Sequence, residues 1–159
     1  MERKKAGKNV NIARDSGGEK QFIRGLGHQA INVKDLGRSK RFYVDVLGLR
    51  VLHEDAMRVF LKVGEGENFG ILALLAKPAD GLEPVDPSLR QGNKYNHFGF
   101  RARAPEEVYE FAEHLKSHGV TILKGPYTRK DGTSIYFLDP DGYTLEHLHL
   151  IENPAAHTK

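Results

Sequence analysis

The sequence contains no cysteine, and this absence excludes disulfide bonds, thiolate metal sites and cysteine nucleophiles. It also lacks any apolar run near the roughly 18 residues of a membrane span, and its longest, at 70–76, is typical of a buried strand. The first ten residues are charged with no apolar stretch behind them, so a secretion signal is not indicated. We therefore expect a cytoplasmic protein without a membrane partner, in which His, Asp and Glu are the available metal ligands.

The positive charge of the chain is concentrated at its N-terminal end. The calculated isoelectric point of about 9.1 would by itself favour a nucleic-acid partner. Residues 1–24, however, carry seven basic and three acidic side chains, and the whole chain is only +3, so residues 25–159 sum to −1. We therefore expect no nucleic-acid partner. We interpret residues 1–23 as a disordered, polar, basic tail and residues 152–159 as a short C-terminal tail.

The body of the chain repeats one unit twice. His28 lies fourteen residues before Phe42, and His97 lies fourteen residues before Phe111. In each copy a strand pattern begins at the His, a helix pattern contains the aromatic residue, and three more strand patterns follow. The expected units are a first βαβββ module at 24–76, a linker loop rich in Pro, Gly and Asp at 77–94, and a second βαβββ module at 95–151.

The expected strands and helices define a fold class. In the first copy we expect strands at 28–33, 49–53, 59–63 and 70–75, with a helix over 36–47. In the second we expect strands at 97–102, 120–123, 134–138 and 143–150, with a helix over 105–118. A helix covers only one face of such a unit, so two units pack together around the uncovered faces. The sequence thus predicts an α+β fold with a curved, incomplete-barrel mixed sheet and helices on its outer face.

Alternation along the strands places three possible metal ligands on the concave side. His28 and His97 occupy equivalent positions in the two copies, and Glu146 lies in the last strand, on the face that shares their cavity. A lone strand His is more often structural, and it is the coincidence of the three that favours a ligand set. Two imidazoles and one carboxylate can hold a divalent ion with positions left open. We expect one such ion, with Fe²⁺, Mn²⁺, Zn²⁺, Ni²⁺ and Co²⁺ all open.

With this plan the chain resembles the vicinal oxygen chelate superfamily, which includes glyoxalase I, extradiol dioxygenases, fosfomycin-modifying enzymes and bleomycin-binding proteins. The resemblance covers about residues 24–150 and rests on three runs: His28-Gln-Ala-Ile-Asn-Val, His97-Phe-Gly-Phe and Tyr136-Phe-Leu-Asp-Pro-Asp-Gly-Tyr-Thr-Leu-Glu146. It implies a metal-dependent enzyme, a small oxygen-chelating substrate and a homodimer. In some members the modules exchange between chains, so the two His ligands can come from one subunit or from two.

The resemblance also separates the reactions of the superfamily. Four-ligand members such as glyoxalase carry an extra ligand on the last strand of the first copy, and the matching run 69–75 offers none. In extradiol dioxygenases a Tyr approaches the substrate, which assigns a catalytic role to Tyr136, but the His expected before it is absent from 127–129. Fosfomycin as substrate is disfavoured because Pro126 stands where a Lys is wanted and no Arg follows Glu146.

We therefore expect a dioxygenase-type oxidoreductase, with a lyase, isomerase or thiol transferase of the same fold as the alternative. A metal-free protein that binds a drug or metabolite is the alternative from another class. The candidate substrate contacts are Asn32 and Arg101, on the concave side, and Arg129, in the loop before the Tyr136 strand; for the two arginines, surface roles compete with this assignment. His147 and His149 alternate with Glu146 and should point away from the metal.

Overall fold

A computed structural model describes residues 26–66, 69–76 and 96–151 of the chain. The two expected tails and the expected linker at 77–94 lie outside these described residues. Within them, no helix combines the length and the apolar character that crossing a bilayer requires.

The first module is a four-stranded sheet with one helical segment. Its strands are β1 (His28–Asn32), β2 (Arg50–Glu54), β3 (Arg58–Val63) and β4 (Gly70–Leu75), in the order β1-β4-β3-β2. Helix α1 (Leu36–Arg41) begins after Asp35, whose side chain accepts a hydrogen bond from the backbone N–H of Arg38. It continues as a π-helical turn, η1 (Phe42–Val46), and the chain leaves this turn at Gly48, which has a φ of 75°.

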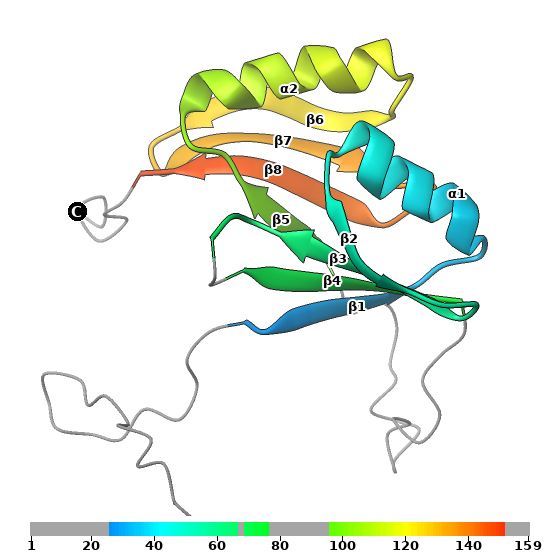
Figure 1. The fold of residues 1–159 in the computed structure, drawn as a ribbon. Helices are drawn as coiled ribbons and strands as arrows, with labels where there is room; N and C mark the ends of the chain where they lie inside the picture. Colours follow the sequence, from blue (N-terminus) through cyan, green and yellow to red (C-terminus); the bar gives the residue numbers. More distant parts are fainter. Residues whose placement is uncertain (1–25, 67–68, 77–95, 152–159) are drawn as a thin grey trace, which may run out of the picture.

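The second module repeats this topology. Its strands are β5 (Phe98–Arg101), β6 (Ile122–Arg129), β7 (Gly132–Leu138) and β8 (Thr144–Leu150), in the order β5-β8-β7-β6, and its helix is α2 (Pro105–Ser117). In both modules the first strand runs parallel to the last, and the remaining pairs are antiparallel. The α+β class is therefore confirmed. The strands form two four-stranded mixed sheets, and the described residues contain no closed barrel (Figure 1).

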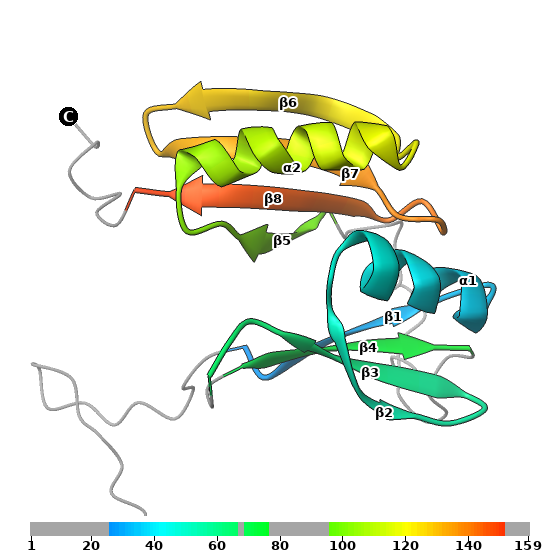
Figure 2. The same ribbon diagram turned by 45° about the horizontal axis from the view of Figure 1, so that its top comes forward.

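One hydrophobic core extends through both modules. Ile31 and Val33, expected beneath the helices, are buried, as are Val108 and Leu115 of α2. In Figure 2, α2 lies over the second sheet and α1 lies over the first. The opposite side of β1 is open, because His28, Ala30 and Asn32 are all exposed.

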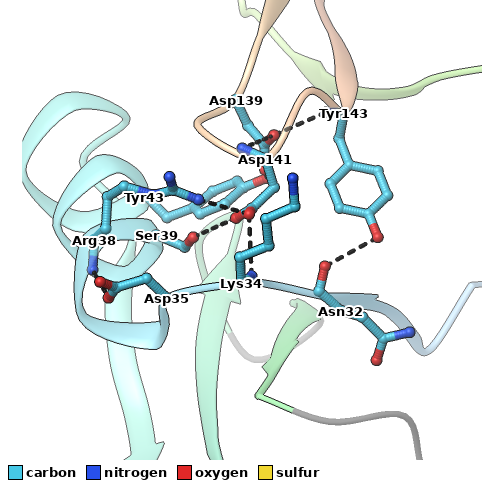
Figure 3. Close-up of polar contacts among 9 residues, drawn as sticks. All are labelled: Asn32, Lys34, Asp35, Arg38, Ser39, Tyr43, Asp139, Asp141 and Tyr143. Carbon is cyan, nitrogen blue, oxygen red and sulfur yellow. Dashed lines mark hydrogen bonds and ion pairs between the residues drawn. The ribbon is translucent and has the colours of Figure 1, made fainter.

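A polar cluster fixes the two modules to each other (Figure 3). The buried hydroxyl of Tyr43, in η1, donates a 2.8 Å hydrogen bond to Oδ2 of Asp139, in the turn between β7 and β8. In the same turn, Asp141 accepts hydrogen bonds from Ser39 Oγ at 2.7 Å and from Arg38 Nη2 at 2.6 Å. The Asp-Pro-Asp-Gly run therefore connects the second module to the first helix.

One expected boundary is wrong. The sequence placed Arg129 in a loop before the Tyr136 strand, but the structure makes it the last residue of β6. Gly125 and Pro126 are typical strand breakers, and here the strand continues past them with a register shift between Lys124 and Tyr127. Gly125 makes this shift possible, since it has a φ of +95° and a Cβ there would lie 2.6 Å from the carbonyl oxygen of Ser134.

Candidate metal centre

Glu146 lies on an interior strand of the second sheet, with its side chain only 7% exposed. It is paired with Gly99 of β5 on one side and with Tyr136 of β7 on the other. Its Oε1 atom is buried and has no hydrogen-bond partner in the part of the chain that the structure describes. A buried carboxylate oxygen without a partner is costly, and a cation bound there would remove that cost.

His97, directly before β5, faces this carboxylate. Its Nε2 atom lies 3.1 Å from Oε2 of Glu146, and its Nδ1 atom lies 2.6 Å from Oδ1 of Asn96. Because the amide oxygen of Asn96 accepts a hydrogen bond, Nδ1 is the donor in that contact. Nε2 then faces the carboxylate, where it donates a hydrogen bond when it carries a proton and can bind a metal ion when it does not. Two donors bound at about 2.1 Å to one ion, at roughly a right angle, are about 3 Å apart. The pair therefore fits two adjacent positions around a divalent ion.

Gly99 keeps the space beside this pair open. A Cβ at this position would lie 2.8 Å from Cδ2 of Leu148 and 3.5 Å from the Cβ of Glu146. The missing side chain at Gly99 thus leaves room for the end of the Leu148 side chain, which would have to shift if residue 99 carried a Cβ.

Tyr136 forms the next wall of the site. Its ring meets the His97 ring edge-on, with centroids 5.1 Å apart and planes at 88°. Burial, and then the neighbouring Glu146 carboxylate, raises the pKa of Tyr136 to about 12. The hydroxyl is therefore protonated at neutral pH and is available as a hydrogen-bond donor.

His28 lies apart from this pair. It is an exposed residue at the start of β1 in the first sheet, and it lines a pocket of about 410 Å³ together with His97. Among the residues that the structure describes, no three His, Asp or Glu side chains lie close enough to hold one ion. The structure thus brings two of the three expected ligands together and leaves the third on the other module.

The three candidate substrate residues have different surroundings. Arg129 lies at the site, with Nη2 3.1 Å from Ser134 Oγ and 3.9 Å from Glu146 Oε1. Arg101 lines a different pocket, of about 390 Å³, between the two modules. Asn32 is exposed on β1, and its carbonyl oxygen accepts a 3.0 Å hydrogen bond from the Tyr143 hydroxyl (Figure 3). Only Arg129 accompanies the His97–Glu146 pair.

Two further expectations concern residues near Glu146. His147 packs against Phe111 of α2, with ring centroids 4.5 Å apart, and thus points away from the site, as its alternation with Glu146 predicts. Sequence reasoning missed Asn96, Tyr127 and Ser134. Alternation along β7 could have found Ser134, which is two residues before Tyr136 and on the same face. We find no comparable sequence pattern that indicates Asn96 or Tyr127.

Comparison with known proteins adds the family context. The family described as the Glyoxalase/Bleomycin resistance protein/Dioxygenase superfamily matches residues 25–147. The glutathione transferase FosA of Serratia marcescens is 31% identical over 125 residues, which cover 79% of this chain and 80% of that protein.

Two other similar proteins are named for other activities. A manganese-dependent 2,3-dihydroxybiphenyl 1,2-dioxygenase of Geobacillus genomosp. 3 is 28% identical over 136 residues, or 82% of this chain, and the match spans only 38% of that longer protein. The crystal structure of a glyoxalase/dioxygenase from Nostoc punctiforme superposes with a TM-score of 0.63 at 26% identity. It covers 90% of this chain and 99% of that one. The chain is thus similar to proteins of more than one activity.

Proposed function

Since this chain belongs to the Glyoxalase/Bleomycin resistance protein/Dioxygenase superfamily, we propose that it is a divalent-metal-dependent enzyme acting on a small oxygen-chelating substrate. His97 and Glu146 provide two ligands of the ion and His28 provides the third. One observation carries the proposal. The buried Oε1 of Glu146 has no hydrogen-bond partner among the described residues, and Nε2 of His97 lies 3.1 Å from the other oxygen of the same carboxylate.

The residues around the pair have separate tasks. A bound divalent ion polarises the oxygens of a chelated substrate and stabilises negative charge on them. Asn96 fixes the orientation and tautomer of the His97 ring through its 2.6 Å contact with Nδ1. Tyr136, protonated at neutral pH because its pKa is about 12, donates a hydrogen bond to a substrate oxygen and holds that oxygen against the ion's position.

Dioxygenase-type oxidation is the reaction that we propose first. It needs open coordination positions, and β4 supports a three-ligand site, because Ile71 and Ala73, which pair with His28 and Ala30, have no metal-binding atoms. The similarity to the manganese-dependent dioxygenase agrees with this assignment. A lyase or isomerase with four protein ligands is correspondingly disfavoured.

Thiol transfer is the second candidate. It draws on the similarity to FosA and on the cations of β6. Lys124 and Arg129 lie on either side of Pro126, the position where a phosphonate-binding lysine was missing from the sequence. An assay of wild-type protein with a panel of catechols under oxygen, and with an anionic epoxide plus glutathione, separates the two. Ring cleavage supports the first reaction, epoxide opening supports the second, and the metal-loaded protein is used in both.

The third ligand comes from a second copy of the chain. Strands β1 and β5 are edge strands, each hydrogen-bonded on one side only among the described residues, and such edges favour pairing with another strand. The polar cluster at Asp139 and Asp141 holds the two modules of one chain in the observed arrangement, in which His28 does not join His97 and Glu146. In a symmetric homodimer, His28 of each copy completes the site of the other.

A mixed-dimer experiment tests this arrangement. His28→Ala and His97→Ala proteins, each defective in metal binding alone, are refolded together and their metal content is measured. If His28 acts between chains, random pairing restores about one quarter of the wild-type sites, because half of the dimers carry one intact site. If the ligands belong to one chain, mixing restores none. A monomer in sedimentation analysis of the metal-loaded wild-type protein also contradicts the shared site.

A further inference from the structure

We propose that the substrate of this site carries an ionised group, a carboxylate or a phosphonate, in addition to its chelating oxygens, and that Arg129, with Lys124, binds it. The inference rests on the proposed metal site and deepens it by naming the substrate class. It comes from two cations of β6, of which Arg129 lies beside Glu146 and Lys124 lies over the neighbouring Tyr127 ring.

The two cations lie against one aromatic side chain. The Lys124 Nζ atom is 5.0 Å from the centre of the Tyr127 ring, and the Arg129 guanidinium carbon is 5.3 Å from it. The Tyr127 ring in turn stacks against Tyr136, with centroids 6.4 Å apart and planes at 23°. Both positive charges thus contact, through cation–π interactions, the ring that stacks on Tyr136, the residue beside His97.

Arg129 also approaches Glu146, one of the two residues of the His97–Glu146 pair. Its Nη2 atom lies 3.9 Å from Oε1 of Glu146, the oxygen that has no hydrogen-bond partner. A divalent ion bound to this carboxylate weakens that attraction and repels the guanidinium. The remaining ion pair of Arg129 is with Asp131, 3.1 Å away, in which both side chains are exposed. Exposed pairs of this kind contribute little. Three of the five N–H groups face Asp131, the Tyr127 hydroxyl at 3.4 Å and Ser134 Oγ at 3.1 Å, which leaves one N–H on each terminal nitrogen for an anion.

The balance of charge points the same way. Without an ion, Arg129 and Lys124 are matched by Glu146 and Asp131. A divalent ion leaves this cluster with an excess of two positive charges around a carboxylate whose side chain is 7% exposed. In such a setting, negative charge on the ligand is strongly favoured. A neutral diol must lose protons to supply it, whereas a carboxylated diol already carries a negative charge at neutral pH.

The test compares ligands that differ only by this group. Protein loaded with Zn²⁺, which has no redox chemistry, is titrated in a calorimeter with catechol, 2,3-dihydroxybenzoate and 3,4-dihydroxybenzoate. We expect at least one of the two acids to bind about tenfold more tightly than catechol, as a charge-assisted hydrogen bond predicts. Equal binding of catechol and both acids would overturn the inference while leaving the metal site intact. Failure of the protein to bind Zn²⁺ would instead overturn the proposed function.

Two variants separate substrate binding from a structural role. Arg129→Gln should lose the preference for the acid and still bind Zn²⁺ at least as tightly as wild type, because a neighbouring positive charge is removed. Lys130→Gln, which removes the adjacent exposed cation, should keep the preference. If Arg129→Gln weakens catechol and the acids equally, the residue only supports the local structure and the inference fails.

Discussion

The hydroxyl of Tyr43 in the first module and the carboxylate of Asp139 in the second are joined by a 2.8 Å hydrogen bond in a buried setting. Burial raises the pKa of Asp139, and this effect outweighs the hydrogen bonds that the carboxylate accepts from Tyr143 N, Tyr43 Oη and Asp141 N. The contact lies between residues 96 positions apart in the chain. This contact and its neighbours join the two modules in the arrangement that separates His28 from His97.

Replacing Tyr43 by Phe should therefore lower the free energy of unfolding. The loss should be about 1.5–3 kcal/mol, the range for a hydrogen bond to a charged group whose partner is left buried. Urea denaturation monitored by circular dichroism measures it. The matched control is Tyr109→Phe, because Tyr109 is 45% exposed and its hydroxyl contacts the exposed Thr128 at 3.2 Å. Its change in the free energy of unfolding should stay within about 0.5 kcal/mol. Equal effects of the two substitutions would show that the Tyr43 contact does not hold the modules together.

The contribution of Asp141 should depend on pH. Burial alone would raise its pKa, but hydrogen bonds from Ser39, Lys34 and Arg38 outweigh burial and lower the pKa below its usual 3.8. A lowered folded-state pKa contributes stability above the unfolded-state value, and this stability is lost as the pH falls through the folded-state pKa. The cost of Asp141→Asn should thus be about 1.5–3 kcal/mol at pH 7.

As the pH falls below 3.8, the same cost should shrink, and it should be lost once the pH has fallen through the lowered pKa of folded Asp141, because the wild-type side chain is then protonated. Urea unfolding of both proteins across this range measures the difference. Asp45→Asn, which alters an exposed acid of η1, is the control and should show little effect at either pH. If Asp141→Asn lowered the free energy of unfolding equally at every pH, the hydrogen bonds to Asp141 would not depend on its negative charge, which contradicts this account.

The hydroxyl of Tyr136 should ionise only well above the usual pKa of a tyrosine. Its pKa of about 12 results from burial and the Glu146 carboxylate. A spectrophotometric titration of the metal-free protein, compared with that of Tyr136→Phe, isolates its absorbance change. The difference should develop near pH 12 and be absent at pH 10. A difference with its midpoint at or below pH 10 would show that the hydroxyl is not held in its protonated form beside Glu146.

Part of this architecture could be predicted from the sequence. The repeat, with His28 and His97 at equivalent positions, predicts the two four-stranded sheets. Alternation within a strand determines which side chains share a face, and it therefore predicts that Glu146 faces the same side as His97. The wrong prediction of a loop at Arg129 has a local cause, which lies at Gly125 and Pro126. They disrupt strand pairing by one register shift without ending β6, and this shift places Arg129 on the sheet rather than in a loop.

Other features depend on contacts that no local pattern encodes. The Asp-Pro-Asp-Gly run indicates a turn, but its packing against Tyr43 and Ser39 is a contact between the two modules. The hydrogen bond of Asn96 to His97 depends on the rotamers of both side chains. The position of His28 relative to the pair depends on how the modules pack, and the strand patterns of the individual modules do not determine that packing.

Equilibrium binding of Mn²⁺, followed by electron paramagnetic resonance, tests the metal centre most directly. Wild-type protein should bind one ion per chain, and Glu146→Gln, which removes the negative charge and nearly preserves the shape, should weaken binding by about a hundredfold or more. His149→Ala, a change of a neighbouring His on β8 whose position alternates with that of Glu146, should bind as wild type does. Glu146→Gln protein that binds Mn²⁺ as tightly as wild type would contradict the account.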